Sequence, residues 1–284
     1  MATQNILLNS SNIVPNTNNS RLTYKFPSPQ VYTDSAMAVH SVQLYYSWFN
    51  INASLYNNHK FQYRWWNNNG VPNNIIDVEI PNGFYDARAL TLYLQKVMLS
   101  RAHYLTDATG KNQYFIEFVE NPAYYSIQLN LYPMYSSLPS GWTKPGNWIL
   151  PSTQQTAMVN ILSVGNFKSL IGFNAGLYPS SPSSTLYQKL SDYAPQISPV
   201  TSLIIRCNLA RNGNALPDDI IYSFSSADTS WGNIISEKPN ELYYSPVLNG
   251  TFDKIDITIL DQNFNPVQII DPNILLTLVI KNNS

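Results

Sequence analysis

Hydrophobic residues recur at every second position in several stretches of the chain, a pattern typical of β-strands with one buried face. The clearest stretch is 252–260, where Ile255, Ile257 and Ile259 fall on one face. Residues 125–131 repeat the pattern, with polar residues at the alternate positions. The apolar positions of this second stretch are Tyr125, Ile127, Leu129 and Leu131. Further β-branched or aromatic runs predict strands at 42–49, 61–66, 75–80, 113–119, 202–209, 220–224 and 274–280.

One stretch has helical periodicity instead. Asp86 is an N-cap candidate, and apolar residues follow it at helical spacing. They are Leu90, Tyr93, Leu94, Val97 and Met98. A shorter amphipathic piece lies at 167–171. Many strands, one clear helix and no regular strand–helix alternation predict an all-β fold, a single jelly-roll antiparallel β-sandwich of about 8–10 strands with long inserted loops.

The distribution of charge and proline along the chain suggests how it is organised. The first 59 residues contain only three charged side chains, Arg21, Lys25 and Asp34. We therefore expect residues 1–37 to form an N-terminal arm, disordered or lying on a neighbouring molecule. Residues 38–284 are expected to form the single jelly-roll domain. A long loop or small insertion is expected around 133–200, which holds 8 of the 19 prolines.

The composition favours a protein that packs against neighbours. Only 12% of the residues are charged, against about 25% in an ordinary globular domain. The chain has 34 asparagines, more than its 33 Asp, Glu, Lys and Arg residues together, and a net charge of −1. Such a surface repels other molecules weakly and so favours association. The absence of a basic excess gives no strong nucleic-acid signal, and no apolar run approaches the ~20 residues of a membrane span.

The residues that usually carry chemistry do not form a recognisable site. His40, His59 and His103 are too widely spaced for common metal-binding motifs, and Cys207 is the only cysteine. No nucleophile-elbow or glycine-rich phosphate motif is present. The adjacent pair Asp218 and Asp219 is typical of a turn, and the acidic stretch 253–265 lacks the glycine and glutamate of a calcium loop. We therefore expect no enzymatic activity, no cofactor and no metal.

Aromatic residues are abundant, with 20 Tyr, 11 Phe and 6 Trp. The segments 45–49 and 63–66 concentrate them. Alternation along a strand would bury some of these rings and leave others for a protein interface. The alternative is a carbohydrate-binding β-sandwich with a role in host attachment, in which Trp65 and Trp66 would be stacking platforms for sugars.

Two segments of the chain match motifs of a known family. Residues 76–98 resemble the I-P-x-G-x-Y-x-x-x-x-L-x-x-x-L junction of penton (minor capsid) proteins from virophages and Maverick/Polinton-type elements. The matching residues are Pro81, Gly83, Tyr85, Leu90 and Leu94. Residues 166–179 are similar to the family's L-G-F-x-x-G-x-Y-P segment, with Ile171 in place of the leucine. The matching residues there are Gly172, Phe173, Gly176, Tyr178 and Pro179.

The rest of the resemblance follows in the same order along the chain. It continues through the segments 204–209, 220–224, 232–235, 243–246, 252–261 and 271–280, and the matching residue of the third is Gly232. The resemblance as a whole runs from about residue 38 to the C-terminus. Each is weakly specific alone, and the ordered set is much more specific.

The first motif also has a physical interpretation. Pro81 would end a strand because it cannot donate a ladder hydrogen bond. Gly83 would allow a positive φ at the corner, and Asp86 would cap the helix. The stripe of Leu90, Leu94 and Met98 would then pack over one end of the sandwich.

The resemblance implies a structural protein of a virion. It implies a single jelly roll that forms homopentamers and closes the five-fold vertices of an icosahedral capsid beside a double-jelly-roll major capsid protein. Other minor capsid proteins are further candidate partners. The protein would be made in the host cytoplasm and not secreted, in agreement with the lack of a signal-like N-terminus. The sequence leaves open the virus and host, the interface residues, any glycan receptor and whether 133–200 projects outward.

Overall fold

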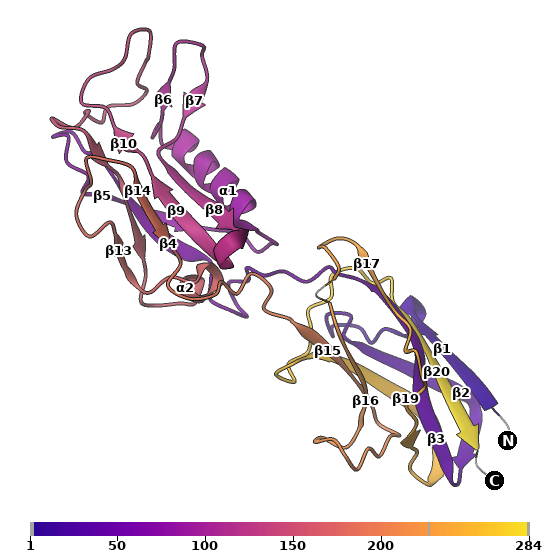
Figure 1. Cartoon of the computed structure of the whole chain (residues 1–284). Helices are drawn as coiled ribbons and strands as arrows, with labels where there is room; N and C mark the ends of the chain where they lie inside the picture. The colour runs from indigo at the N-terminus through magenta and orange to yellow at the C-terminus, as the bar shows by residue number, and fades with distance from the viewer. Residues whose placement is uncertain (1–2, 227, 283–284) are drawn as a thin grey trace. The chain divides into compact units, whose positions relative to one another are not determined.

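The computed structural model describes residues 3–226 and 228–282, and its contacts divide the chain into two compact units. Unit 1 is formed by two segments, Met1–Trp48 and Ser198–Ser284, and unit 2 is the segment between them, Phe49–Ile197. In Figure 1 the two ends of the chain, indigo and yellow, lie in the same unit. The expected single domain over 38–284 is therefore replaced by one unit inserted into another. The insertion begins near residue 49, well before the expected 133–200 segment.

Unit 1 is made of two antiparallel sheets. The first has the order β1-β20-β3-β17, with β18 also paired to β3, and the second has the order β16-β15-β19-β2. The strands are β1 (Thr3–Asn9), β2 (Arg21–Tyr32), β3 (Ser35–Tyr45), β15 (Ser202–Cys207), β16 (Ile220–Ser225), β17 (Ile234–Glu237), β18 (Ser245–Pro246), β19 (Gly250–Asp261) and β20 (Leu275–Asn282).

The strand order of unit 1 is that of a jelly roll. When its eight main strands are numbered along the chain, leaving out the short β18, one sheet reads 1-8-3-6 and the other 2-7-4-5. Chain neighbours therefore lie mostly in opposite sheets, as two nested Greek keys require. This confirms an all-β antiparallel jelly roll. It is built from the two ends of the chain, with unit 2 between its third and fourth strands.

The N-terminal arm expected at 1–37 is not what the described residues form. β1 pairs with β20 over its whole length, and β2 pairs with β19. Ile6 and Leu8 of β1 point into the core while Leu7 between them is exposed. Both strands lie at sheet edges, where prolines such as Pro27 and Pro29 are tolerated because one side of the strand is unpaired. Their polar composition therefore concealed two strands.

Unit 2 has a four-stranded sheet, β13-β12-β4-β5, and a three-stranded sheet, β14-β9-β8. It also has two small two-stranded sheets, the hairpin β6–β7 and the pair β10–β11, whose strands are joined by the long segment 135–154. The strands are β4 (Lys60–Trp65), β5 (Asn74–Glu79), β6 (Leu105–Thr106), β7 (Asn112–Gln113), β8 (Ile116–Asn121), β9 (Ser126–Leu131), β10 (Pro133–Met134), β11 (Gln155–Thr156), β12 (Met158–Ile161), β13 (Gly176–Tyr178) and β14 (Tyr187–Leu190). Three-residue 3₁₀ turns occupy Ser10–Asn12 in unit 1 and Pro122–Tyr124 in unit 2.

An aromatic core connects the elements of unit 2. Phe61 of β4 stacks on Phe167 with ring centroids 4.8 Å apart and meets Phe118 of β8 edge-on at 5.8 Å. Helix α1 (Ala87–Ser100) covers the free edge of β8 (Figure 1). The Thr91 hydroxyl donates to the carbonyl of Phe118 and accepts from its amide, both at 2.7 Å. The helix thus satisfies a strand edge that would otherwise be open to other chains.

Most sequence-predicted elements are present with shifted ends. The helix is confirmed, with the Asp86 carboxylate accepting from the Ala89 amide at 2.6 Å, and α2 (Phe167–Ile171) has the predicted bounds. The predicted faces of β19 and β9 are buried. Tyr125 differs from its prediction, because it precedes β9 in a left-handed conformation with φ 48° and is exposed.

Gly172 ends α2 in a conformation that only glycine fits. Its φ is +77°, and a Cβ built there would lie 2.2 Å from the carbonyl oxygen of Tyr193. We expect Gly172→Ala to lower the free energy of unfolding by roughly 3 kcal/mol, since positive φ and a backbone clash both act against it. Urea denaturation would measure this change.

Gly110→Ala is the matched control. Gly110 has a similar φ of +83° with nothing within 4 Å of a built Cβ, so its cost should be only about 1 kcal/mol. Equal losses in the two variants would contradict the close-contact explanation.

Candidate functional site

The first motif forms the connection from β5 into α1. β5 ends at Glu79, and the Ile80 amide still donates to the His59 carbonyl at 2.8 Å, so the ladder stops at Pro81 as expected. Gly83 does not have the positive φ that we expected. It instead exchanges two backbone hydrogen bonds with Ile51, at 2.9 and 3.0 Å. A Cβ on Gly83 would lie 2.7 Å from the ring of Tyr85, so the glycine makes room for that ring.

Asn50 anchors this connection, although no motif singled it out. Its side chain is buried, with Oδ1 accepting from the Tyr85 amide at 2.8 Å. Its Nδ2 donates to the carbonyls of Tyr85 and Ile197, both at 2.9 Å. Asn50 thus joins the start of unit 2 to its last residue. The helix that follows buries Leu90 and Leu94, as predicted.

The second motif surrounds the end of α2. Phe173 is fully buried against the ring of Tyr178, with centroids 5.5 Å apart. The Tyr178 hydroxyl donates to the Asn174 carbonyl at 3.0 Å and lies 3.3 Å from Asp192 Oδ2. Gly176 begins β13, and Pro179 follows its end after a cis bond. In unit 1, Gly232 has φ +85°, and its amide donates to the Tyr46 carbonyl.

These motif residues contact the backbone and core of their own unit. Two of the clusters, around Gly83 and around Gly172, belong to the core of unit 2 through Leu90, Leu94 and Phe173. Their contacts hold turns and helix ends in place. The residues of these two motifs therefore have structural contacts within unit 2.

Cys207 is buried, and the adjacent carboxylates of Asp218 and Asp219 both lie beside arginines. Burial raises the pKa of the Cys207 thiol to about 12, which keeps it protonated. Asp219 pairs with Arg206 through two hydrogen bonds of 2.7 and 2.8 Å, and Asp218 lies 3.7 Å from Arg211. Within the described ranges, no three His, Cys, Asp or Glu side chains are close enough together to hold a metal ion. No helix there is long and apolar enough to cross a membrane.

The acidic stretch around Asp261 is a turn. The Asp261 Oδ1 atom accepts from the amides of Asn263 and Asn265 at 2.8 and 2.9 Å. Its carboxylate is therefore used to stabilise the turn after β19.

The aromatic segments proposed as sugar platforms are interior. Trp65 and Trp66 both have 0% of their surface exposed, and Tyr46 and Trp48 are also buried. Alternation would have left one of two neighbouring tryptophans outside, but Trp66 follows the end of β4 and turns inward against Trp148. The Trp65/Trp66 platform is therefore wrong.

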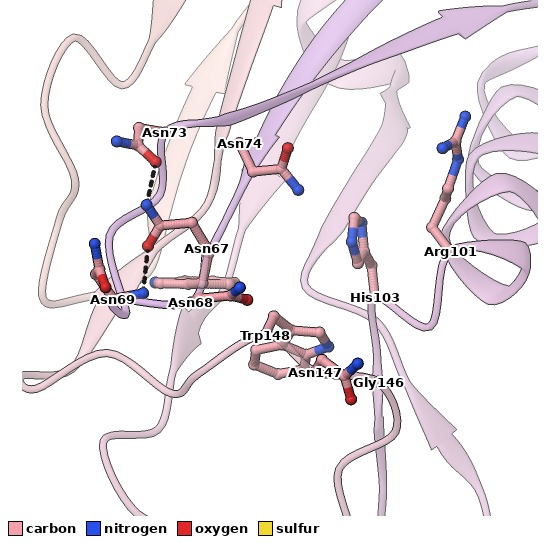
Figure 2. A pocket seen from close by; sticks show the side chains of 11 residues that line it. Asn67, Asn68, Asn69, Asn73, Asn74, Arg101, His103, Gly146, Asn147 and Trp148 are labelled. Carbon is pink, nitrogen blue, oxygen red and sulfur yellow. Dashed lines mark hydrogen bonds between the residues drawn. The ribbon is translucent and has the colours of Figure 1, made fainter.

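A pocket of about 530 Å³ lies beside this tryptophan cluster (Figure 2). Six asparagines line it together with Arg101, His103 and Trp148. Asn67 shapes one wall, because its Nδ2 donates to Asn73 Oδ1 at 2.7 Å and its Oδ1 accepts from the Asn69 amide at 2.8 Å. The aromatic rings at its base, Trp66 and Trp148, are almost fully buried. The pocket offers amides to a ligand but little ring surface.

The outer face of the first sheet of unit 1 carries almost no charge. Alternation buries Leu8, Val42, Ile235 and Leu276 and turns their neighbours outward. Among the Asp, Glu, Lys and Arg residues of these described strands, only Lys281 is at an outward position. It sits at the end of β20, with its ammonium 3.8 Å from the Tyr244 ring centre. The remaining surface, here called the uncharged face, comprises Leu7, Ser41, Gln43, Tyr45, Ile234, Ser236, Leu275 and Thr277.

The second sheet of unit 1 presents the opposite character. Its outward positions along β2, β15 and β19 carry five charged side chains. They are Arg21, Lys25, Arg206, Lys254 and Asp256. Two neighbouring sheets of one jelly roll thus differ in charge, which marks the uncharged face as a candidate protein interface.

His103 makes unit 2 sensitive to acid. Its Nδ1 shares a 2.7 Å hydrogen bond with the buried Tyr63 hydroxyl, and its ring stacks on Trp65. Burial and the nearby Arg101 charge lower the pKa of His103 to about 4, below the usual histidine value of 6.5. Between these values the unfolded chain binds more protons than the folded one. Stability should therefore fall as pH drops from 6.5 to 4.

His103→Gln removes this titration while keeping a hydrogen-bond acceptor. We expect its melting temperature to fall less than that of the unmodified protein between pH 7 and pH 4, as measured by circular dichroism. A pH dependence identical to that of the unmodified protein would show that His103 is not the titrating group.

No family model matches the sequence, and no curated protein matches it. Among solved structures, the mavirus penton protein matches with 12% identity and a TM-score of 0.43, over 99% of this chain and 98% of that chain. A chain in the cryo-EM structure of the Sputnik virophage matches with 12% identity and a TM-score of 0.40, over 98% and 96% of the two chains. Both solved structures are matched along nearly the whole length of this chain.

Proposed function

We propose that this protein is a non-enzymatic structural component of an icosahedral virus capsid. In this role it is a penton, or minor capsid, protein that assembles as a homopentamer at the five-fold vertices. The observation that carries the proposal is the uncharged face on a complete eight-strand jelly roll. The ordered penton-like motifs in the sequence support the same assignment.

The uncharged face suits a permanent interface. A ring of five subunits uses a head-to-tail contact, so each subunit buries two different surfaces. A charge buried there without a partner costs several kcal/mol, whereas Ser, Thr and Gln can exchange hydrogen bonds across the contact. Leu7 and Ile234 are each about half exposed in the isolated chain and would supply apolar contacts.

The proposal includes the surroundings of the ring. The protein would be made in the host cytoplasm and incorporated in the virion. A double-jelly-roll major capsid protein would surround each pentamer, and other minor capsid proteins are further candidate partners. The scarcity of charge along the chain is compatible with contacts on several sides.

Native mass spectrometry over a range of concentrations tests the assembly. We expect a species near five times 32.1 kDa for the unmodified chain. Leu7→Lys combined with Ile234→Lys should shift it to monomers, because two unpaired charges would be buried in the contact.

Val31→Lys is the matched control. Val31 is an exposed apolar residue on β2, in the sheet that already carries charges, so its replacement should leave the pentamer intact. A pentamer that survives the double substitution would place the contact elsewhere. A monomer at every concentration, also when mixed with a major capsid protein, would contradict the vertex function.

A further inference from the structure

A second cleft in unit 2 has the features of a ligand site. It encloses about 670 Å³, within the range of about 300–1,000 Å³ that small-molecule sites occupy. Its walls come from helix α1, the β6–β7 hairpin, strand β8 and the 132–142 segment. The sequence motifs single out none of these lining residues.

Aromatic rings with accessible surface line one side of this cleft. Tyr132 and Tyr135 are each 36% exposed. Trp142 meets Tyr135 edge-on at 5.4 Å, and Tyr135 in turn meets the buried Phe115 edge-on at 6.5 Å. These contacts hold the rings in fixed orientations before any ligand arrives. The carbon–hydrogen face of a sugar packs well on such rings because the ring face is partly negative.

A carboxylate is held in place beside the rings. Glu117 Oε1 accepts from the Tyr132 hydroxyl at 2.6 Å and from Asn130 Nδ2 at 2.9 Å. The hydrogen bond to Glu117, together with burial, raises the pKa of Tyr132 to about 12. The second oxygen of Glu117 has no hydrogen-bond partner in the part of the chain that the structure describes. It is therefore an oriented acceptor for ligand hydroxyl groups.

Amide groups complete the polar lining. Gln95 on α1 and Gln154 both line the cleft, and their side chains make no hydrogen bond to the described residues. Each amide offers one acceptor and two donor hydrogens, which matches the mixed hydrogen bonding of sugar hydroxyls. The only formal charges in the lining are those of Glu117 and Lys111, which cancel. The cleft is thus polar without net charge.

We propose that this cleft binds a neutral oligosaccharide. Fixed aromatic rings, an oriented carboxylate and unpaired amides converge on it. This inference is independent of the capsid assignment, because the cleft belongs entirely to unit 2. If the capsid assignment holds, the cleft would give the particle a means of attaching to a glycan-coated host.

The asparagine-lined pocket of Figure 2 does not have this combination. Its rings, Trp66 and Trp148, are 0% and 6% exposed, so they cannot stack on a sugar without unpacking the core. Asn147, which lines that pocket in the same unit, is an exposed residue and provides a control position.

A glycan array probed with the intact purified chain would identify the ligand, and titration with the best glycan would give its affinity. We expect Tyr135→Ala and Glu117→Gln each to weaken binding by about tenfold or more. Asn147→Ala should leave the affinity unchanged. Thermal unfolding of each variant would verify that it is folded. Ultraviolet titration of the Glu117→Gln variant should show the pKa of Tyr132 falling from about 12 toward its usual 10.

Several results would overturn the proposal. One is the absence of binding to any neutral glycan at millimolar concentration. Others are selective retention on sulfated or sialylated glycans, or equal affinity in all three variants. Binding that a peptide but no sugar displaces would also overturn it. Because the affinity is measured whatever the oligomeric state, its failure would leave the vertex assignment untouched, and the reverse also holds.

Discussion

The antiparallel pairing of the two ends of the chain is the contact on which unit 1 depends. β3 bonds to β20 and β2 to β19, across more than two hundred residues of sequence. Neither sheet of the jelly roll is complete until these distant strands meet. Closing so long a loop costs conformational entropy before any contact offsets it. Unit 2 leaves the jelly roll after β3 and returns before β15, and it has its own core. An independently packed insertion keeps the intervening residues from adding to that cost as a free loop.

Asparagine side chains hold the loops of unit 2 in place by hydrogen bonds to the backbone. Asn50 and Asn58 are both buried, and Asn58 Nδ2 donates to the Asn50 carbonyl while its Oδ1 accepts from the Asn52 amide. Asn67 closes the turn after β4 by the same means. An amide can donate and accept at once without the desolvation cost of an ion. The loops of unit 2 can therefore be ordered with few ion pairs, and the asparagine-rich composition acquires a structural reason.

Charge and aromatic surface are distributed according to position in the fold. Unit 1 separates an uncharged sheet face from a charged one. Unit 2 buries Trp65, Trp66 and Trp148 but leaves Tyr132 and Tyr135 partly open. The first arrangement suits a lasting protein contact, and the second suits a reversible polar ligand. The two features lie in different units, so assembly and ligand binding need not compete for one surface.

Local pattern determined much of the secondary structure. Period-two alternation placed Ile255, Ile257 and Ile259 on the buried face of β19, and helical spacing after Asp86 placed Leu90 and Leu94 in the core. Both predictions depend on residues a few positions apart. They succeed because side-chain direction within a strand or helix is set by the local backbone.

Tertiary pairing decided the rest. The polar strands β1 and β2 exist because distant partners bond to them, and Gly83 is required by the ring of Tyr85 instead of a positive φ. Burial of both Trp65 and Trp66 follows from how β4 packs within unit 2. The meeting of Glu117 with Tyr132, Gln95 and Gln154 depends on the same packing. The sequence by itself determined both helices and the strands with a clear apolar pattern, because such a pattern depends on neighbours in the chain. Only the folded molecule decided which surfaces are uncharged, open or hollow, because that depends on residues far apart in sequence.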